Sequence, residues 1–325
     1  GDAGTGKSGF ALAECMDLAV GGGRLTDPCE PVRVLYVNAE DPRLEIDRRA
    51  EAFCLRFGLD NDHLAGRFSV IGAGEPGADL ILASQERGGV ELRRAALAAL
   101  GEVAGAYDLV VLDPLVSFHH ANENDNGAMD ALIKALAKLA KEAECAIELV
   151  HHVRKPPGAA QAVTGDSMRG ASAIRGALRD LRVVNLMNDK QATEYGVNPR
   201  TRRHYLRVTH DKSNYGPLAA DAWFRRESVP VPTGEHLNGI AQTRHAPVPV
   251  PWTPPTSSVA RTFTAEQLAE IYRLVVEHEY VLGDSSLRSL AKGIAPILEL
   301  DYSDAEQAKR ARLARADLVS SGMIE

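Results

Sequence analysis

The feature that most constrains the fold of this chain is its first eight residues, GDAGTGKS, which match the pattern G-x-x-x-x-G-K-[ST] without a gap. Gly4 and Gly6 permit positive φ angles, so the backbone can turn several N–H groups toward one anion. Lys7 can reach terminal phosphates, and Ser8 supplies a hydroxyl that can bind Mg²⁺. A helix-forming run over residues 9–20 follows. We therefore predict a phosphate-binding loop made by Gly1, Asp2, Ala3, Gly4, Thr5, Gly6, Lys7 and Ser8.

A loop of this kind normally follows a β-strand, and this sequence has neither that strand nor an initiator Met before Gly1. We therefore expect the sequence to be a fragment that lacks its natural N-terminus. The alternative for the loop is a glycine-rich turn with an unrelated lysine, but such a turn does not require the full eight-residue pattern.

Composition places the chain among ordinary globular proteins, because 45% of its 325 residues are hydrophobic and 25% are charged. This length allows one large domain and a smaller one. The net charge of −7 argues against a protein that coats nucleic acid through its global charge, although a local basic surface would not show in that sum. Four cysteines form no C-x-x-C pair, and no apolar run approaches the ~20 residues of a membrane span. We expect a reduced, cytoplasmic protein without a membrane segment.

Short apolar runs alternate with helical runs from Ser8 to about Leu186, which predicts an α/β fold with a mainly parallel sheet. The strand and helix pairs span 32–37 with 43–57, 109–112 with 128–143, and 146–150 with 170–181. Two further β runs, 203–209 and 221–227, flank a turn at 214–217 and predict a β-hairpin at the end of the sheet. We therefore assign residues 1–228 to one domain.

Seven of the seventeen prolines lie between Val229 and Phe263, a density that favours extended chain over a packed helix. We predict a proline-rich linker over 229–262 and a small helical or winged-helix-like module over 263–325. In that module Leu313 and Leu318 have a spacing suited to a buried helix face. Four cations share the same predicted helix, where they either bind DNA phosphates or simply face solvent: Lys309, Arg310, Arg312 and Arg315.

Two apolar strands end in carboxylates that could act on a bound nucleotide. The run 107–113 ends at Asp113, which would lie beside Ser8 and bind Mg²⁺, unless it only caps the strand before Pro114. The run 34–41 ends at Glu40 and Asp41. We favour Glu40 as the general base that activates water and Asp41 as a helix cap, although both acids could cap the helix that begins near Arg43.

A third strand, 146–150, ends in the adjacent pair His151 and His152. Polar groups at the carboxyl ends of parallel strands face the ligand crevice, so one histidine can sense a γ-phosphate. A zinc site is disfavoured, because adjacent strand residues point to opposite faces and no third ligand is suitably spaced.

Several short motifs occur here in one order: 39–42, 112–119, 151–152, 169–172 and 212–216. With these motifs the chain resembles the RepA-type hexameric replicative helicases of broad-host-range plasmids and the related RecA-like ATPases of phages and mobile elements. The resemblance covers residues 1 to about 227 and does not reach the C-terminal module.

The resemblance implies a RecA-like P-loop NTPase core that binds ATP and Mg²⁺, forms a homo-oligomeric ring, a hexamer in the manner of the family, and acts as a DNA helicase on single-stranded DNA. It further implies Glu40 as base, His152 as sensor, and an arginine that reaches the ATP of a neighbouring subunit. Arg179 matches that finger best, Arg169 is the reserve, and Lys212 is a second candidate in trans. The alternative for these cations is a solvated face or an ion pair within the domain.

Two segments, 119–127 and 155–168, would then line a central pore. The first is acidic, with Glu123 and Asp125 and no Lys or Arg, which departs from a nucleic-acid loop. This departure favours an alternative function, a regulatory or loader-type ATPase that acts on a protein partner without unwinding DNA. A third alternative, a DNA-binding initiator whose phosphate loop is only structural, does not explain the presence of both Glu40 and Asp113.

Overall fold

The structure is a computed structural model that describes residues 4–86, 89–152, 171–237, 240–255, 263–277 and 289–320. The chain divides into two compact units. The first combines Gly1–Leu186 with His204–Trp252, and the second combines Met187–Arg203 with Thr253–Glu325.

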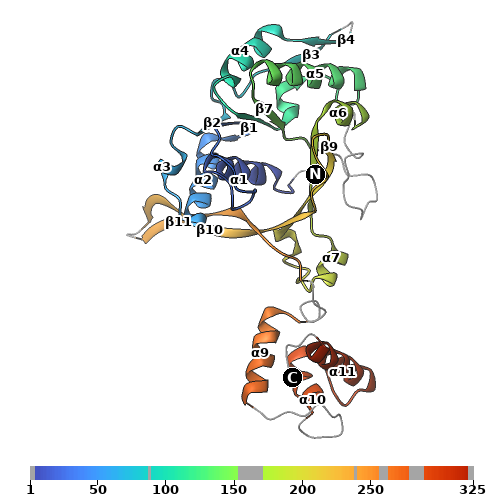
Figure 1. Ribbon diagram of the computed structural model, residues 1–325. Coiled ribbons are helices and arrows are strands. Elements are labelled where there is room, and N and C mark those ends of the chain that lie inside the picture. Colours follow the sequence, from blue (N-terminus) through green and yellow to red (C-terminus); the bar gives the residue numbers. More distant parts are fainter. Residues whose placement is uncertain are drawn as a thin grey trace. The chain divides into compact units, whose positions relative to one another are not determined.

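A parallel sheet with strand order β2-β1-β5-β7 forms the centre of the first unit (Figure 1). Its strands are β1 (Val34–Pro42), β2 (Phe68–Ala73), β5 (Leu109–Asp113) and β7 (Ala146–Leu149). Both β2 and β5 pair with β1 in parallel, and β7 pairs with β5 in parallel. The predicted α/β class with a parallel sheet is therefore confirmed.

Helices cover both faces of this sheet because its buried strands are apolar on both faces. Tyr36 and Val111 pack on the side of α1 (Lys7–Ala19) and α2 (Arg43–Phe57). The alternate residues of the same strands, Leu35, Val37, Val110 and Leu112, pack on the other side. There they contact the core that contains α4 (Arg94–Ala104) and α5 (Asn126–Glu142). The short elements α3 (Asn61–Leu64) and η1 (Leu115–Phe118) lie in connections.

The apolar periodicity predicted for α5 is confirmed, since Leu132, Leu136 and Leu139 are buried. Its N-terminus is capped by Asp125, whose carboxylate accepts the N–H groups of Gly127 and Ala128 at 2.9 and 3.1 Å. A three-stranded sheet of order β4-β3-β6 lies beside this layer and contains β3 (Ala83–Glu86), β4 (Gly89–Leu92) and β6 (His119–His120).

An antiparallel sheet of order β11-β10-β9-β8 completes the first unit. Its strands are β8 (Asp180–Leu186), β9 (Tyr205–Ser213), β10 (Ala222–Leu237) and β11 (Ile240–Pro251), and α6 (Ala171–Ala177) precedes β8. The pairing of β9 with β10 is the hairpin expected near residues 203–227. Phe10 of α1 packs with Leu206, Val208 and Phe224 of this sheet.

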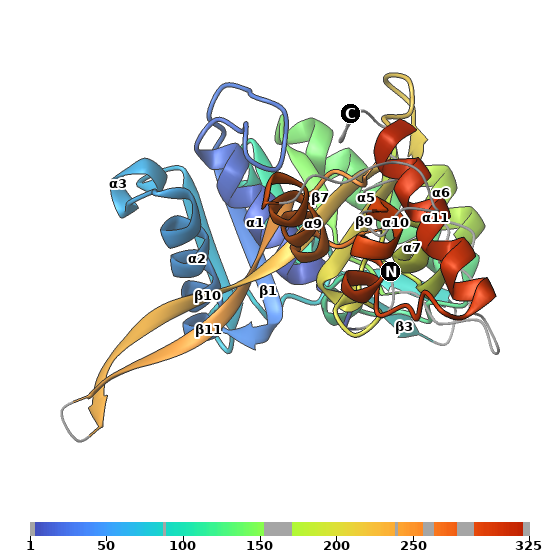
Figure 2. The same cartoon turned by 90° about the horizontal axis from the view of Figure 1, so that it is seen from below.

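Residues 229–237 and 240–251, predicted to be part of a linker, instead belong to a long two-stranded ribbon in which β10 pairs with β11 (Figure 2). The five prolines of this ribbon all fall in one alternating set of pairs, with register Phe224↔Pro251, Arg226↔Pro249, Ser228↔Pro247, Pro230↔His245 and Pro232↔Thr243. In an antiparallel ladder only every second pair exchanges N–H···O bonds, so prolines confined to one set do not interrupt the ladder. The linker prediction was wrong because it considered only the number of prolines. Their spacing of two residues, which a β-strand tolerates, was not taken into account.

The residues between the prolines attach this ribbon to the domain. Val231, Ala246 and Val248 are buried in the core that contains α1 and α2, while Pro230, Pro232 and Pro247 are exposed. Helices α1 and α2 therefore lie between the parallel sheet and the β10–β11 ribbon (Figure 1).

The second unit contains α7 (Asp189–Glu194), η3 (Arg202–His204) at its boundary, and the C-terminal helices α9 (Ala265–Glu277), α10 (Leu290–Ile294) and α11 (Ala305–Ser320), with η4 (Pro296–Leu298). The C-terminal helices share a small core with Ile271, Ile294 and Leu318. Leu313, expected on the buried face, is 59% exposed, because Ala311 and Ala314 occupy that face instead. None of the helices in the described residues has the length and apolar composition of a membrane span.

Candidate nucleotide-binding site

The phosphate loop leads directly into α1, with Gly4 and Gly6 at φ angles of 73° and 88°. Gly6 is the N-cap of the helix and Lys7 is its first residue. Thr5 and Lys7 are buried, and the Lys7 ammonium donates to the Thr5 hydroxyl at 3.4 Å. Gly1, Asp2 and Ala3 lie outside the described residues. The part from Gly4 onward thus places a helix N-terminus and a buried cation together, as an anion site requires.

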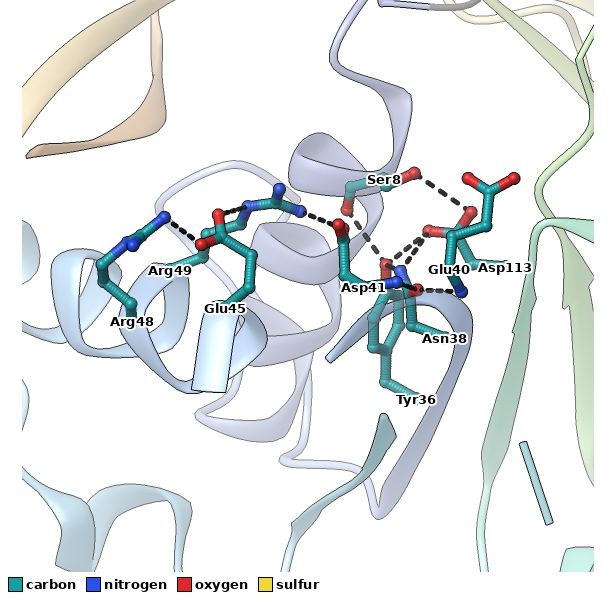
Figure 3. Close-up of polar contacts among 9 residues, drawn as sticks. All are labelled: Ser8, Tyr36, Asn38, Glu40, Asp41, Glu45, Arg48, Arg49 and Asp113. Atoms are coloured by element: carbon teal, nitrogen blue, oxygen red, sulfur yellow. Dashed lines mark hydrogen bonds and ion pairs between the residues drawn. The ribbon is translucent and has the colours of Figure 1, made fainter. Parts of the chain in front are cut away.

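Ser8 and Asp113, the two predicted metal ligands, meet at the end of β5 (Figure 3). The Ser8 hydroxyl donates to Asp113 Oδ1 at 3.1 Å, although the two residues are 105 positions apart. A hydroxyl and a carboxylate are hard oxygen donors of the kind that Mg²⁺ takes beside waters and phosphate oxygens. The donor set therefore fits a magnesium ion held between the loop and β5.

Sequence reasoning missed two residues that surround Asp113. Tyr36 hydrogen-bonds through its hydroxyl to the Asp113 carboxylate, and the amide of Asn38 donates to the Tyr36 oxygen at 3.3 Å. Asn38 is 1% exposed and pairs with Asp113 in the sheet register. Their signal in the sequence was the pair of polar side chains at alternate positions of an otherwise apolar strand. Together they orient the carboxylate that would face the metal.

Burial raises the pKa of Asp113 to about 6, against the opposing hydrogen bonds from Tyr36 and Ser8, and the nearby Glu40 and Asp41 add to the increase. The carboxylates of this edge disfavour one another's ionised forms in the absence of a cation. A divalent cation at this position would relieve that repulsion, which supports the magnesium assignment.

Glu40 and Asp41 have different surroundings at the end of β1 (Figure 3). Both backbone N–H groups donate to the Asn38 side-chain oxygen, at 2.9 and 2.7 Å. The Asp41 carboxylate is bound by Arg49 at 2.7 Å, whereas the exposed Glu40 carboxylate has no hydrogen bond or ion pair to a described residue. Asn38 therefore shapes the turn that directs Glu40 toward Asp113 and the loop.

The prediction that Asp41 caps α2 was wrong, because the N-cap is Pro42 and no side chain caps this helix. Asp41 instead joins an ion-pair cluster on α2, in which Arg49 also binds Glu45 at 2.9 Å. The helix starts at a residue with fixed φ, so a capping side chain is not needed to define its beginning.

His151 and His152 follow β7 and lie in different environments. Burial lowers the pKa of His152, and Lys7 lowers it further while Glu40 opposes the change. Burial lowers the pKa of His151 to about 4, and its Nδ1 lies 3.8 Å from Glu123 Oε1. His151 is therefore neutral at neutral pH, and its contact with Glu123 is not an ion pair. The assignment of His152 as the γ-phosphate sensor stays a prediction.

The structure describes two of the three predicted trans-acting cations, Arg179 and Lys212. Arg179 is exposed just before β8, and its guanidinium has no ion pair with a described residue. The Lys212 ammonium donates to the carbonyls of Arg175, Gly176 and Leu178 at 2.7, 3.3 and 2.6 Å, which terminates α6. Lys212 thus has an intradomain role in this chain. Arg169 lies outside the described residues.

An ion-pair network that the sequence did not predict holds α1 against the strands. Arg182 of β8 binds Glu14 of α1 at 2.6 Å and Glu148 of β7 at 3.2 Å. Burial opposes the charge of Arg182, but the two carboxylates outweigh it and raise its pKa, while burial raises the pKa of Glu14 to about 7. The helix that carries Lys7 and Ser8 is therefore tied to both sheets of the first unit.

Residues 1–158 match a protein-family model described as "AAA domain", over the segment that contains the loop, Glu40, Asp113 and His152. With the α/β fold and the geometry of the site, this match supports a P-loop ATPase.

Comparison with solved structures finds similarity to the RadB recombinase, with 14% identity, a TM-score of 0.43, and coverage of 69% of this chain and 84% of that chain. A DnaB-like replicative helicase is similar with 11% identity and a TM-score of 0.46, over 69% of this chain and 53% of that one.

Proposed function

We propose that this chain hydrolyses ATP with Mg²⁺ as a RecA-like motor, and that it works as a ring-forming replicative DNA helicase of a plasmid, phage or integrated element. The observation that carries the ATPase part is the meeting of Ser8, Asp113 and Glu40 at the mouth of the phosphate loop. The helicase part rests on the ordered motifs that resemble RepA-type helicases.

Each residue of the site has a defined task in this proposal. Lys7 and the loop N–H groups neutralise the phosphate charge, and Ser8 and Asp113 hold Mg²⁺. Glu40 accepts a proton from the attacking water, which its position beside Asp113 and its freedom from ion pairs with described residues both support. His152, neutral at neutral pH, can donate a hydrogen bond to a γ-phosphate oxygen.

An arginine from a neighbouring subunit completes the proposed site. Arg179 is the candidate, because it is exposed and its guanidinium is not held by a described partner. Arg169 remains the reserve. Lys212 is the weaker candidate, since a role in trans would require its ammonium to leave the carbonyls of α6.

The acidic segment 119–127, which favoured a loader-type ATPase, has a structural explanation. Glu123 is 14% exposed beside His151, and Asp125 caps α5. Asp125 therefore has a capping role within its own domain, and the Glu123 side chain is largely buried rather than displayed on the surface. The acidity of segment 119–127 therefore no longer favours a protein partner, and DNA remains the proposed substrate.

The test is the rate of phosphate release by the full-length protein with ATP, with and without Mg²⁺ and single-stranded DNA. We expect Mg²⁺-dependent hydrolysis that DNA accelerates, and a Lys7→Ala variant that neither binds nor hydrolyses ATP. A hydrolysis rate that DNA does not change would support the loader alternative. A wild-type rate in the Lys7→Ala variant would reject this site.

A further inference from the structure

A second cation from a distant part of the sequence lies against the phosphate loop. A Cβ placed on Gly6 would lie 2.9 Å from Nη1 of Arg226 and 3.6 Å from its Cδ and Cζ. Gly6 is the residue immediately before Lys7, and its backbone belongs to the proposed phosphate cradle. The Arg226 guanidinium therefore occupies the space beside the loop that a side chain at position 6 would need.

The chain holds Arg226 at this place through a neighbouring aromatic contact. Phe224 of β10 packs on Phe10 of α1 with ring centroids 4.8 Å apart. Phe10 belongs to the first turn of α1, where its N–H donates to the Gly6 carbonyl at 2.9 Å. Because Phe224 and Arg226 are two residues apart on a strand, they project to the same face of β10. The aromatic pair thus fixes the strand that carries Arg226 to the helix that begins at the loop.

The adjacent Arg225 projects to the opposite face and serves a different purpose. Its guanidinium pairs with Glu227, which also accepts a hydrogen bond from Arg56 of α2 at 2.6 Å. These three residues form a surface ion-pair cluster that joins β10 to α2. Arg225 is therefore a matched control for Arg226, with the same side chain one position away.

The surroundings of Arg226 suit an anionic ligand. It is half-buried, and burial lowers its pKa, which still leaves the guanidinium charged. A planar guanidinium offers five N–H donors in a geometry that matches phosphate oxygens. A partly desolvated cation next to an anion-binding loop gains interaction energy when a phosphate arrives.

We propose that Arg226 is a phosphate-binding residue that acts in cis, on the α- or β-phosphate of the nucleotide in its own loop. This inference rests on the proposed function, because it requires that the loop binds a nucleotide. Lys7, Glu40 and His152 are the residues assigned to the terminal phosphate in the proposed function, whereas Arg226 lies against Gly6, at the N-terminus of α1. Arg226 therefore serves ADP and ATP alike, unlike a trans finger that responds to the γ-phosphate.

The test is equilibrium binding of fluorescent ADP and ATP analogues to the full chain. We expect Arg226→Ala to weaken both by about tenfold, the size of one lost charge-assisted contact, and Arg226→Lys to restore part of the loss. Arg225→Ala should bind both nucleotides as the wild type does. The inhibition constant of inorganic tripolyphosphate, measured by competition with the analogue, should rise about tenfold in Arg226→Ala, because the lost contact is to phosphate.

The outcomes separate this inference from the proposed function. If Lys7→Ala abolishes binding while Arg226→Ala binds like the wild type, the site stands and the role of Arg226 is rejected. Unchanged competition by tripolyphosphate would place Arg226 on the base or sugar and would also reject it. If the wild type binds no nucleotide, the proposed function itself fails. Should Arg226→Ala unfold, which circular dichroism would reveal, the uncharged Arg226→Gln variant decides by weaker binding of both nucleotides and a less steep dependence of binding on salt; wild-type binding by that variant would reject the proposal.

Discussion

At the scale of single residues, the site separates two adjacent acids by their partners. Asp41 is bound by Arg49, whereas Glu40 is exposed beside Asp113 and has no ion pair with a described residue. Two other neighbouring pairs also have different surroundings: Arg226 lies against the loop while Arg225 pairs with Glu227 on the surface, and His151 lies beside Glu123 while His152 does not. Neighbours in sequence thus differ in role because alternate side chains enter different environments.

The first prediction concerns the proposed base. Glu40→Gln should bind ATP with near wild-type affinity but lose hydrolysis by at least about a hundredfold, because the amide keeps the shape of the carboxylate without its basicity. Asp41→Asn is the control, since its partner is Arg49, and it should retain most of the turnover. Single-turnover hydrolysis and nucleotide binding measured on both variants provide the check. Equal losses in the two variants would assign Glu40 no special role.

The second prediction concerns pH and His151. Its folded pKa of about 4 lies below its ordinary value of 6.5, so the unfolded chain binds more protons between these values. The contribution of His151 to stability is therefore complete above pH 6.5 and is lost as pH falls toward 4. By this linkage the wild type should lose about 2 kcal/mol more than His151→Gln between about pH 7.5 and about pH 5.

Urea unfolding of both proteins at the two pH values measures this difference. Glu14 has the opposite sign, because its raised pKa of about 7 makes stability fall as pH rises from 4.5 toward 7. That effect is common to both proteins and cancels in the comparison. Identical pH dependence in wild type and variant would mean that His151 is not neutralised by folding.

At the scale of elements, the β10–β11 ribbon is the least expected part of the structure. It covers α1 and α2 with one row of small apolar side chains and turns most of its prolines to solvent. The packing of α1 and α2 therefore includes residues of β10 and β11, which a linker would not provide.

The third prediction tests whether this ribbon is part of the domain. Val248→Ala should lower the free energy of unfolding of the ATPase core by about 2 kcal/mol, because Val248 is 1% exposed and its loss leaves a cavity. Pro247→Ala, at an exposed position of the same strand, should change stability by less than about 1 kcal/mol. Chemical denaturation followed by circular dichroism gives both values. No effect from Val248→Ala would restore the linker interpretation.

At the scale of the whole molecule, two cations proposed to act on a neighbouring subunit's nucleotide differ in their freedom to do so. Lys212 is held by carbonyls of its own domain, whereas Arg179 is exposed. A site shared between neighbouring copies of the chain, with Arg179 as the contributed residue, is therefore the proposed arrangement.

The fourth prediction follows from this arrangement. Arg179→Ala and Glu40→Gln proteins should each be inactive, and mixing them should recover part of the ATPase rate, because some interfaces then combine an intact finger with an intact base. The measurement is steady-state hydrolysis across mixing ratios, with mixed assemblies confirmed by native mass spectrometry. Mixed assemblies without any recovery would indicate that each subunit hydrolyses ATP alone.

The sequence alone determined the phosphate loop, the parallel α/β class and the meeting of Ser8 with Asp113. The loop and the strand that ends at Asp113 are local patterns, because positive φ at Gly4 and Gly6 and a carboxylate at a strand end depend on a few consecutive residues. The meeting of Ser8 with Asp113, 105 positions apart, was predicted from the occurrence of both motifs in one chain. The fold class could be predicted because apolar strands and helices alternate along the chain, and the parallel sheet confirms it.

Only the tertiary structure decided which distant residues complete the site. Tyr36 and Asn38 reach Asp113 because β1 and β5 pair in register, and Arg226 reaches Gly6 because β10 packs on α1. The proline-rich segment forms a ribbon because its prolines occupy alternate pairs of the β-ladder and its valines are buried in the core with α1 and α2. Register and packing join residues that lie far apart in the chain, and their energies depend on the folded neighbours, which no local pattern contains.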